Sequence, residues 1–374
     1  ICVQPSSSPV SDSSAGIQSL SVLSFASSRS QGPAIFRLHP SREDIKMSDL
    51  KGEPIGGECG ELLKKYFIND FRFGYKRYRG VTMPVSFEPY MDKIENLIVR
   101  EDDIWVMSYP KTGTTWTQEM VWCLANNLDF EGAKEFLPQR FPFLEHTCLF
   151  DYTQVLPRKP DLKFPAFAEN SVDFINNLKS PRFIKTHLPW QLLPLTIRNG
   201  EKKPKIIYVC RNPKDTCISY YHHCILMEGY RGNFENFFKL FIGDSVTFSP
   251  FWSHIDGFWK IRNNPNVLFL RYEDMKQDLP SVIWKTAHFL EQDITQEDVD
   301  VLSDHLSFNS MKNNPAVNYE AVIEINRNFN LIPADGEFMR KGTGGEWKDK
   351  MSPEMIEKFN KWTDENLTKR GMEI

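Results

Sequence analysis

Short apolar runs that each end in polar residues recur along the chain. They are Ile104–Met107, Phe183–Ile184, Ile206–Val209 and Val267–Leu270. Such runs are typical of strands buried in a parallel sheet. Helix-like segments lie between or after them, for example residues 117–125 and residues 281–290, the second directly after Pro280. This alternation predicts an α/β fold, a single domain with a mostly parallel central sheet flanked by helices.

The first 46 residues differ from the rest. They are rich in serine, and Asp12 is their only acid before Glu43. We therefore expect residues 1–46 to be disordered. A transit peptide would fit this composition, but the first methionine is Met47, so we favour Met47 as the natural start and the segment before it as a translated leader or a fragment. Residues 47–100 are expected to be an irregular lead-in that packs on a domain spanning 101–374.

Composition narrows the possible partners and compartment. A net charge of -4 argues against nucleic acid as the main partner, since binding to phosphate backbones needs a basic surface. No apolar stretch is long enough to cross a bilayer. The seven cysteines are scattered, without CxxC pairs, which favours free thiols in a reducing compartment over disulfides or a metal site. We expect a cytoplasmic protein without a metal.

The stretch SYPKTGTTW, residues 108–116, directly follows the first apolar run. Gly113 lets backbone amides approach a ligand, and Thr114 begins a helix whose N-terminal amides and dipole favour an anion. Lys111 adds a full positive charge. The stretch therefore predicts a P-loop-like anion site between a strand and a helix.

Basic and aromatic residues also follow the other three apolar runs. They are Lys185-Thr186-His187, Arg211–Asp215 and Arg271–Asp274. Ligands of such sheets bind where the carboxyl ends of the strands meet. These segments therefore indicate a site for an anionic nucleotide.

The order of residues in the loop bears on which nucleotide binds. The nucleotide P-loop reads GxxxxGK[ST], whereas here the lysine precedes the glycine and the first glycine is missing. No acidic magnesium ligand is evident, because Asp215 and Asp274 both lie beyond basic or aromatic residues. A kinase that uses ATP and magnesium is thus the less favoured reading. A sulfuryl group carries one negative charge fewer than a phosphoryl group, so lysine and backbone amides suffice for it.

Five motifs in order resemble those of the cytosolic sulfotransferases. They are SYPKTGTTW, Lys185–Pro189, Arg211–His222, Tyr272–Met275 and Arg340–Gly342, and the resemblance covers roughly residues 70 to 370. Residues 130–134 and 140–145 look most like the insect branch. The resemblance implies a P-loop-like phosphosulfate-binding loop and the donor 3'-phosphoadenosine 5'-phosphosulfate (PAPS), with adenosine 3',5'-bisphosphate (PAP) as product.

The resemblance also implies how the donor is held. Its 5'-phosphosulfate would lie on residues 111–115, its 3'-phosphate in the Arg211 pocket, and its adenine between two aromatic rings. The residues expected to bind it are Lys111, Thr112, Gly113, Thr114, Thr115, Trp116, Arg211, Ser219, Tyr272, Ser307, Phe308, Met311, Arg340, Lys341 and Gly342. Where many relatives have a threonine before the Ser-Phe pair, this chain has Leu306, so one adenine hydrogen bond is not expected.

Catalysis is assigned by the same resemblance. His187 would be the general base that takes the hydroxyl proton of the acceptor. Lys111 would stabilise the bridging oxygen as the S–O bond breaks, and Lys185 the sulfuryl oxygens. Ser219 completes the expected catalytic set. The acceptor would be a small apolar phenol, sterol, retinoid or other alcohol, and Phe143 and His223 would line its pocket.

Further outcomes stay open at this point. Elimination of a sulfonated intermediate would make the reaction a retinol dehydration. A non-catalytic nucleotide-binding protein is the alternative from another class. The family's dimer contact near the carboxyl end would correspond to Lys348, Ser352-Pro353 and Glu357, and Pro353 alters that motif, so a homodimer is expected only with a changed contact.

Overall fold

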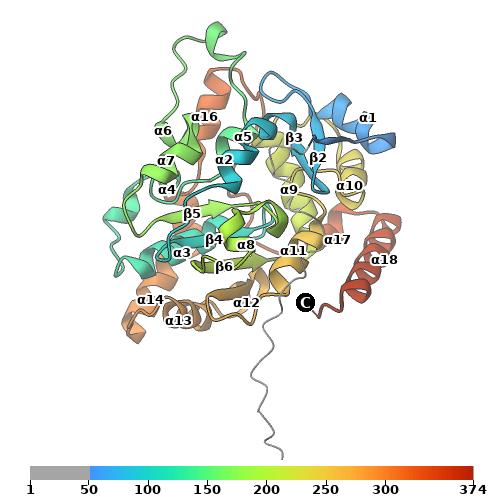
Figure 1. Cartoon of the computed structure of the whole chain (residues 1–374). Helices are drawn as coiled ribbons and strands as arrows, with labels where there is room; N and C mark the ends of the chain where they lie inside the picture. Colours follow the sequence, from blue (N-terminus) through green and yellow to red (C-terminus); the bar gives the residue numbers. More distant parts are fainter. Residues whose placement is uncertain (1–50, 374) are drawn as a thin grey trace, which may run out of the picture. The chain divides into compact units, whose positions relative to one another are not determined.

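The structure, a computed structural model, describes residues 51–373. The expected disordered leader, the expected start at Met47 and Cys2 lie outside these residues. In the described part the predicted α/β architecture is confirmed: a four-stranded sheet lies in the centre with helices on both sides (Figure 1). None of the helices of residues 51–373 has the length and apolar character that a membrane span requires.

All four predicted strands form, and they belong to one sheet. They are β4 (Ile104–Ser108), β5 (Phe183–Thr186), β6 (Lys205–Cys210) and β7 (Val267–Arg271). The order is β5-β4-β6-β7 and every pair is parallel. Val106 pairs with Lys185 on one side and with Ile207 on the other. The carboxyl ends of the strands therefore meet at one edge, as the sequence predicted.

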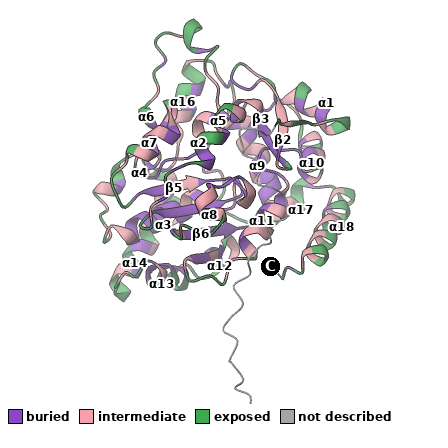
Figure 2. Cartoon of the chain, in the orientation of Figure 1, coloured by how far each residue is buried: buried purple, intermediate pink, exposed green. Residues whose placement is uncertain are grey.

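Both faces of the sheet are buried, which explains the uninterrupted apolar runs. Along β4, Trp105 and Met107 belong to one hydrophobic core, whereas Ile104 and Val106 belong to the other. The strands are buried, while the outer sides of helices such as α18 (Pro353–Arg370) are exposed (Figure 2).

Helices connect the strands and cover both faces. The longer ones are α1 (Gly57–Tyr66), α3 (Thr114–Ala125), α9 (Pro213–Met227), α10 (Phe234–Ile242), α11 (Phe251–Trp259), α13 (Leu279–Phe289), α14 (Gln296–His305), α16 (Glu320–Asn328) and α18. Shorter ones are α2 (Met91–Glu95), α4 (Leu137–Arg140), α5 (His146–Leu149), α6 (Ala166–Glu169), α7 (Ser171–Asn177), α8 (Leu195–Arg198), α12 (Tyr272–Gln277), α15 (Phe308–Asn313) and α17 (Trp347–Lys350).

The described part of the lead-in is not irregular, so that part of our expectation is wrong. It holds a three-stranded antiparallel sheet in the order β1-β2-β3, from β1 (Glu53–Pro54), β2 (Tyr75–Tyr78) and β3 (Val81–Pro84). A two-residue turn joins β2 to β3, and both of its residues, Arg79 and Gly80, have positive φ. Such turns match the twist of a hairpin. We overlooked the arginine-glycine pair as a turn signal.

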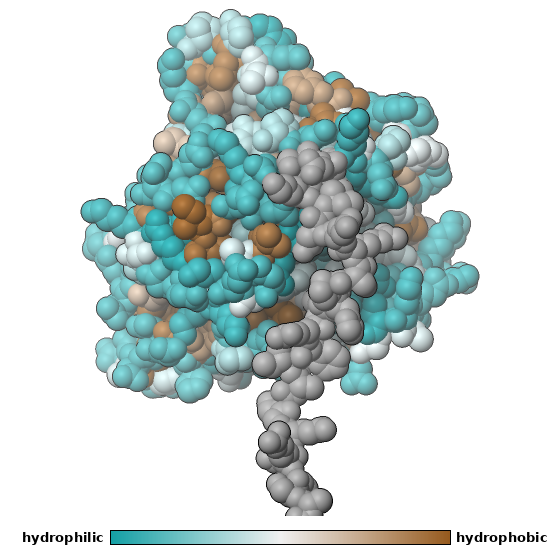
Figure 3. Space-filling view, in the orientation of Figure 1, coloured by the Kyte–Doolittle hydropathy of each residue, from teal (hydrophilic) through white to brown (hydrophobic). Residues whose placement is uncertain are grey.

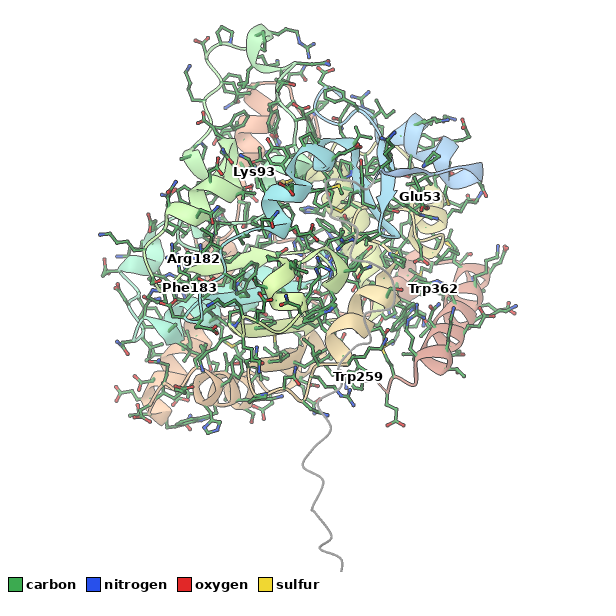
Figure 4. The ribbon with its side chains drawn as sticks, viewed as in Figure 1. Glu53, Lys93, Arg182, Phe183, Trp259 and Trp362 are labelled. Carbon is green, nitrogen blue, oxygen red and sulfur yellow. The ribbon has the colours of Figure 1, made fainter. Side chains whose placement is uncertain are left out.

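A buried ion pair fixes the starts of β4 and β5. Arg182 donates to both carboxylate oxygens of Asp103 at 2.7 and 2.6 Å, and to the carbonyl of Ile98 at 2.6 Å. Both charged side chains are fully buried. Figure 4 labels Arg182 beside Phe183, the first residue of β5. Because the pair lies at the amino ends of the strands, it leaves the opposite edge of the sheet to the site.

The carboxyl-terminal helix α18 opens with the altered dimer motif. Ser352 is its N-cap, and its hydroxyl accepts from the amide of Met355 at 3.2 Å. Pro353 occupies the first helical position, where a missing amide costs no intrahelical bond. Trp362 packs its ring on Phe241 and Phe251.

The face of the molecule drawn in Figure 3 is mainly hydrophilic, and its hydrophobic patches are small and separated. The homodimer stays a prediction.

Candidate functional site

A cavity of about 710 Å³ lies at the carboxyl edge of the sheet and brings together most of the predicted residues. Its walls come from the β4–α3 loop, the end of β5, the helix α9, the helix α15 and the loop after α16. The predicted residues that line it are Lys111, Gly113, Thr114, Thr115, Trp116, Phe143, Lys185, His187, Arg211, Ser219, His223, Tyr272, Phe308, Met311, Arg340, Lys341 and Gly342. Leu306 also lines it.

Two predicted binding residues do not line the cavity. Thr112 is fully buried, and its hydroxyl lies 2.8 Å from the carbonyl of Tyr109 and 2.9 Å from that of Val209. Ser307 is the N-cap of α15 and accepts from the amide of Ser310 at 3.2 Å. The hydroxyls of Thr112 and Ser307 already form hydrogen bonds within the protein. Their side chains therefore hold the β4–α3 loop and the start of α15 in place.

The loop between β4 and α3 has the geometry of an anion cradle. Gly113 is the N-cap of α3 with φ of 106°, and Lys111 also has positive φ, 68°. A Cβ on Gly113 would stand 2.8 Å from the ring of Tyr272, so close approach as well as φ requires glycine there. The first amides of α3 have no intrahelical acceptor. They are thus available to an anion.

Two lysines converge on this cradle. Lys111 Nζ lies 4.0 Å from the ring centroid of Phe338, and Lys185 Nζ lies 4.3 Å from that of Phe143. Burial, reinforced by the charges of Lys185 and Arg211, lowers the pKa of Lys111 to about 7. Burial also lowers the pKa of Lys185 to about 8, against an opposing effect of Glu145. Burial and mutual repulsion therefore disfavour two full charges in the cradle, a cost that an anionic ligand removes.

These pKa values predict how anion binding depends on pH. A bound anion favours the charged lysines, so above about pH 7 binding must take up a proton. We expect the affinity for PAP to fall by up to about tenfold per pH unit between pH 7 and 8, and more steeply once Lys185 also loses its proton. Calorimetry in buffers of different ionisation enthalpy measures this uptake. Binding that is independent of pH from 6 to 9 would contradict it.

Arg211 follows β6 and faces the same loop. Its guanidinium lies 4.2 Å from the ring centroid of Tyr272, and its Nη1 donates to the carbonyl of Lys111 at 3.4 Å. Its Nε is buried and has no partner, and the same is true of Nε1 of Trp116. Buried donors without acceptors are costly. At the wall of a cavity they fit a ligand rich in oxygen or ring nitrogen acceptors.

The loop of Arg340 and Lys341 is held by an acid that our sequence reasoning missed. Glu346 accepts from both terminal nitrogens of Arg340, at 2.7 Å for Nη1, and from Lys341 at 3.2 Å. These cations, Arg340 first, hold the pKa of Glu346 down at about 2. The position of Glu346, close after the Arg-Lys-Gly motif, was the only signal for it in the sequence.

Gly342 brings that loop against the predicted adenine site. It has φ of 64°, and a Cβ there would stand 2.2 Å from the ring of Phe308. The amide of Gly345 donates to Asp215 of α9 at 2.8 Å. The glycine therefore allows the loop to pack directly on Phe308, while Asp215 fixes it to the helix that follows Arg211.

His187 stands at the end of β5 in a defined tautomer. Its Nδ1 lies 2.7 Å from the carbonyl oxygen of Ser108, which can only accept, so Nδ1 carries the proton. Nε2 is then the unprotonated nitrogen. Burial first, and then the charge of Lys185, holds the pKa of His187 well below its usual range. The imidazole is therefore neutral near pH 7, and Nε2 can accept a proton.

Two buried groups hold the backbone of His187, and the sequence did not assign either of them. Glu145 accepts from the amide of His187 and, at 2.8 Å, from the hydroxyl of Thr186. His254 donates from Nε2 to the carbonyl of His187 at 2.9 Å, and its Nδ1 lies 2.8 Å from the hydroxyl of Tyr208. His254 is itself fully buried.

The other end of the cavity is mainly aromatic. Phe143 and Phe248 contact the ring of His187, with centroids at 5.1 and 5.6 Å. Further aromatic side chains line the cavity, namely Phe136, Phe150, Tyr152, Phe164, Phe167, Tyr319 and Phe338. Such a wall suits an apolar ligand with few polar groups. Apart from Phe143, the sequence reasoning missed these residues because they come from segments without a motif, most of them loops and one, Phe167, the short helix α6.

One cluster of the described residues has the chemistry of a metal site. Glu119, Cys123 and His305 bring one ligand atom each to within 4.8 Å of one another. However, Oε1 of Glu119 lies 2.7 Å from Nε2 of His305, and its other oxygen accepts from Arg140. The carboxylate is thus already satisfied by a histidine and a guanidinium. The cluster therefore ties α3 to α14 and α4.

The comparisons with known proteins agree with this geometry. The family described as "Sulfotransferase domain" matches residues 101–371. The chain belongs to the sulfotransferase family. It is 43% identical over 313 residues to the luciferin sulfotransferase of Photinus pyralis, covering 83% of this chain and 84% of that one. It is 36% identical to human sulfotransferase 1E1, covering 80% and 95%.

The solved structures of sulfotransferase relatives extend the likeness to the fold. A retinol dehydratase in complex with androsterone and the inactive cofactor PAP has a TM-score of 0.77 and 31% identity, covering 87% of this chain and 98% of that one. The same enzyme in a complex with retinol and PAP gives a TM-score of 0.76. The predicted family and enzyme class are confirmed, and the insect relative agrees with the predicted branch.

Proposed function

We propose that this sulfotransferase moves the sulfuryl group of PAPS to the hydroxyl of a small apolar acceptor, with His187 as general base. The observation that carries the proposal is the state of His187. Its Nδ1 proton is engaged by the carbonyl of Ser108, which leaves Nε2 free to accept. The imidazole lines a cavity that has lysines and a P-loop-like cradle on one side and aromatic rings on the other.

The residues of the cradle fit the donor. The amides at the start of α3 suit its 5' end, and the buried Nε of Arg211 and Nε1 of Trp116 still need acceptors. Arg211, Arg340 and Lys341 would bind the 3'-phosphate, for which an arginine fork is better suited than a point charge. The adenine would lie between Trp116 and Phe308. Thr112 and Ser307 would support these residues without touching the donor through their side chains.

The chemical step follows from the same residues. Nε2 of His187 takes the proton of the acceptor hydroxyl while its oxygen attacks the sulfur in line. The S–O bond to the bridging oxygen breaks, and Lys111 stabilises the charge that develops on that oxygen. Lys185 faces the sulfuryl oxygens, and Ser219 lies beside the donor. No covalent intermediate with the protein is required, and PAP leaves as the product.

The acceptor class follows from the aromatic end of the cavity. Phenols, sterols, retinoids and other alcohols all combine an apolar body with one hydroxyl. Dehydration of retinol is a second candidate, favoured by the likeness to retinol dehydratase over 87% of this chain. There a sulfonated intermediate would lose its sulfate by elimination. The same donor site serves both outcomes, so the mass of the product separates them.

The test is a screen with purified protein, isotopically labelled PAPS and acceptors from each class, including retinol and a luciferin. We expect label in the product of at least one hydroxyl compound, with no loss of activity when EDTA is added and no competition by ATP. Dehydration would instead give an unlabelled product lighter by one water. Absence of both transfer and PAP binding would refute the proposal.

We also infer a cytoplasmic location. The cysteines of the described residues, Cys59, Cys123, Cys148, Cys210, Cys217 and Cys224, are all free thiols. Unpaired thiols throughout a large domain are typical of a reducing compartment. Fluorescence microscopy of the tagged full chain in cells would test this.

A further inference from the structure

A buried ion pair lies behind the acceptor end of the cavity and has no part in the steps above. Arg72 is fully buried, and its Nη1 donates to Glu228 and, at 2.8 Å, to the hydroxyl of Tyr75. Its Nη2 donates to the carbonyl of Leu149 at 3.1 Å. Glu228, the C-cap of α9, is buried as well and lines the cavity. The guanidinium therefore fixes the carboxylate in one orientation.

The second oxygen of this carboxylate faces a histidine of the cavity wall. Oε1 of Glu228 lies 3.6 Å from Nε2 of His223. The other ring nitrogen, Nδ1, is buried and has no hydrogen-bond partner. A neutral imidazole carries one proton, and a proton on Nε2 points at a carboxylate whereas one on Nδ1 would point at nothing. The arrangement thus favours a proton on Nε2 and an unpaired acceptor at Nδ1.

His223 lies close to the reacting groups. Burial first, and then the charges of Lys111 and Lys185, holds the pKa of His223 well below its usual range. His223 and His187 both line the cavity. The ring of His223 also lies 6.0 Å from that of Phe338, which covers Lys111. The ring of His223 therefore lies in the wall of the same cavity as His187 and Lys111, with a neutral acceptor nitrogen that has no partner.

We propose that His223, oriented by the Arg72–Glu228 pair, is a specificity-determining residue that selects acceptors with a second, neutral O–H or N–H donor next to the reacting hydroxyl, such as catechols. One hydroxyl would give its proton to His187, and the neighbouring one would donate to Nδ1 of His223. The terminal torsion of histidine has broad preferences, so a modest rotation of the ring brings Nδ1 to the ligand. This inference rests on the proposed function and names the acceptor class for that site.

A buried acceptor that stays unpaired costs roughly 1 to 3 kcal/mol, so the preference should be about tenfold or more. The test compares catechol with 2-methoxyphenol, which has almost the same shape but lacks the second donor. We expect kcat/KM for catechol to exceed that for 2-methoxyphenol by about tenfold. His223→Phe and Glu228→Gln should each reduce this ratio to about one, the second because an amide no longer holds the Nε2 proton in place.

His288→Phe is the matched control, since His288 is an exposed histidine of α13 and should leave the ratio as it is. Thermal unfolding and PAP binding of each variant separate a lost selectivity from a lost fold. The proposal is overturned if His223→Phe keeps the preference, or if the wild-type protein has none. If the protein transfers no sulfuryl group at all, calorimetry with the PAP complex still measures the ratio of the affinities for catechol and 2-methoxyphenol. Failure of the proposed function can therefore be distinguished from failure of this inference.

Discussion

His187→Ala should lower kcat by about 10²- to 10⁴-fold and leave the affinity for PAP nearly unchanged. The carbonyl of Ser108 holds the Nδ1 proton, and the low pKa keeps the ring neutral, so Nε2 is the group that can take the hydroxyl proton. The residues expected to bind PAPS and PAP lie instead in the loop of Gly113, at the start of α9 and in the loop of Arg340. Single-turnover transfer and calorimetry with PAP measure the two quantities.

The control for this variant is His288→Ala, which removes an exposed imidazole of α13. It should change neither quantity. Equal rates for His187→Ala and the wild-type protein would remove the general base from the mechanism. A loss of PAP binding together with the rate would instead show that His187 acts by holding the β5 end, where Glu145 and His254 contact its backbone.

The sequence predicted the sheet and the cradle because both depend on local patterns. A strand that is buried on both faces is recognisable in the sequence as an uninterrupted apolar run, whatever its surroundings. The residues that follow parallel strands must then meet at one edge of the sheet. Lys111, Lys185 and Arg211 were therefore found from their place after a strand. The lowered pKa values of Lys111 and Lys185 could not be found in this way, because the burial of Lys111 depends on rings such as Phe338 that come from distant loops.

The residues that position the catalytic group could not be read from the sequence. Glu145 is separated from His187 by 42 residues and His254 by 67, so each contact depends on how whole elements pack. The expected role of Thr112 and Ser307 in donor binding stays a prediction. They lie within the motifs, but a hydroxyl that already bonds to the fold at Val209 or Ser310 is not presented to a ligand.

Replacing Lys111 by methionine should lower kcat by about 10²- to 10³-fold. The positive charge of Lys111 should stabilise the transition state more than it stabilises the bound donor. The pKa of Lys111 is only about 7, because the side chain is buried and other cations are near. As the S–O bond breaks, negative charge grows on the bridging oxygen. The electrostatic attraction between this oxygen and a nearby cation is then far stronger than it is in the ground-state donor. Methionine keeps an unbranched side chain at this position and removes the ammonium group that lies over the ring of Phe338.

The measurement is kcat at saturating PAPS together with PAP affinity, with Lys358→Met on α18 as the control for loss of one exposed charge. Lys111→Met should also lose the proton uptake that accompanies anion binding between pH 7 and 8, because the group that takes up that proton is gone. If the variant binds PAP more weakly but keeps its kcat, Lys111 contributes equally to ground state and transition state. Its function would then be to hold the donor, and the stabilisation of the leaving oxygen would have to come from the amides at the start of α3.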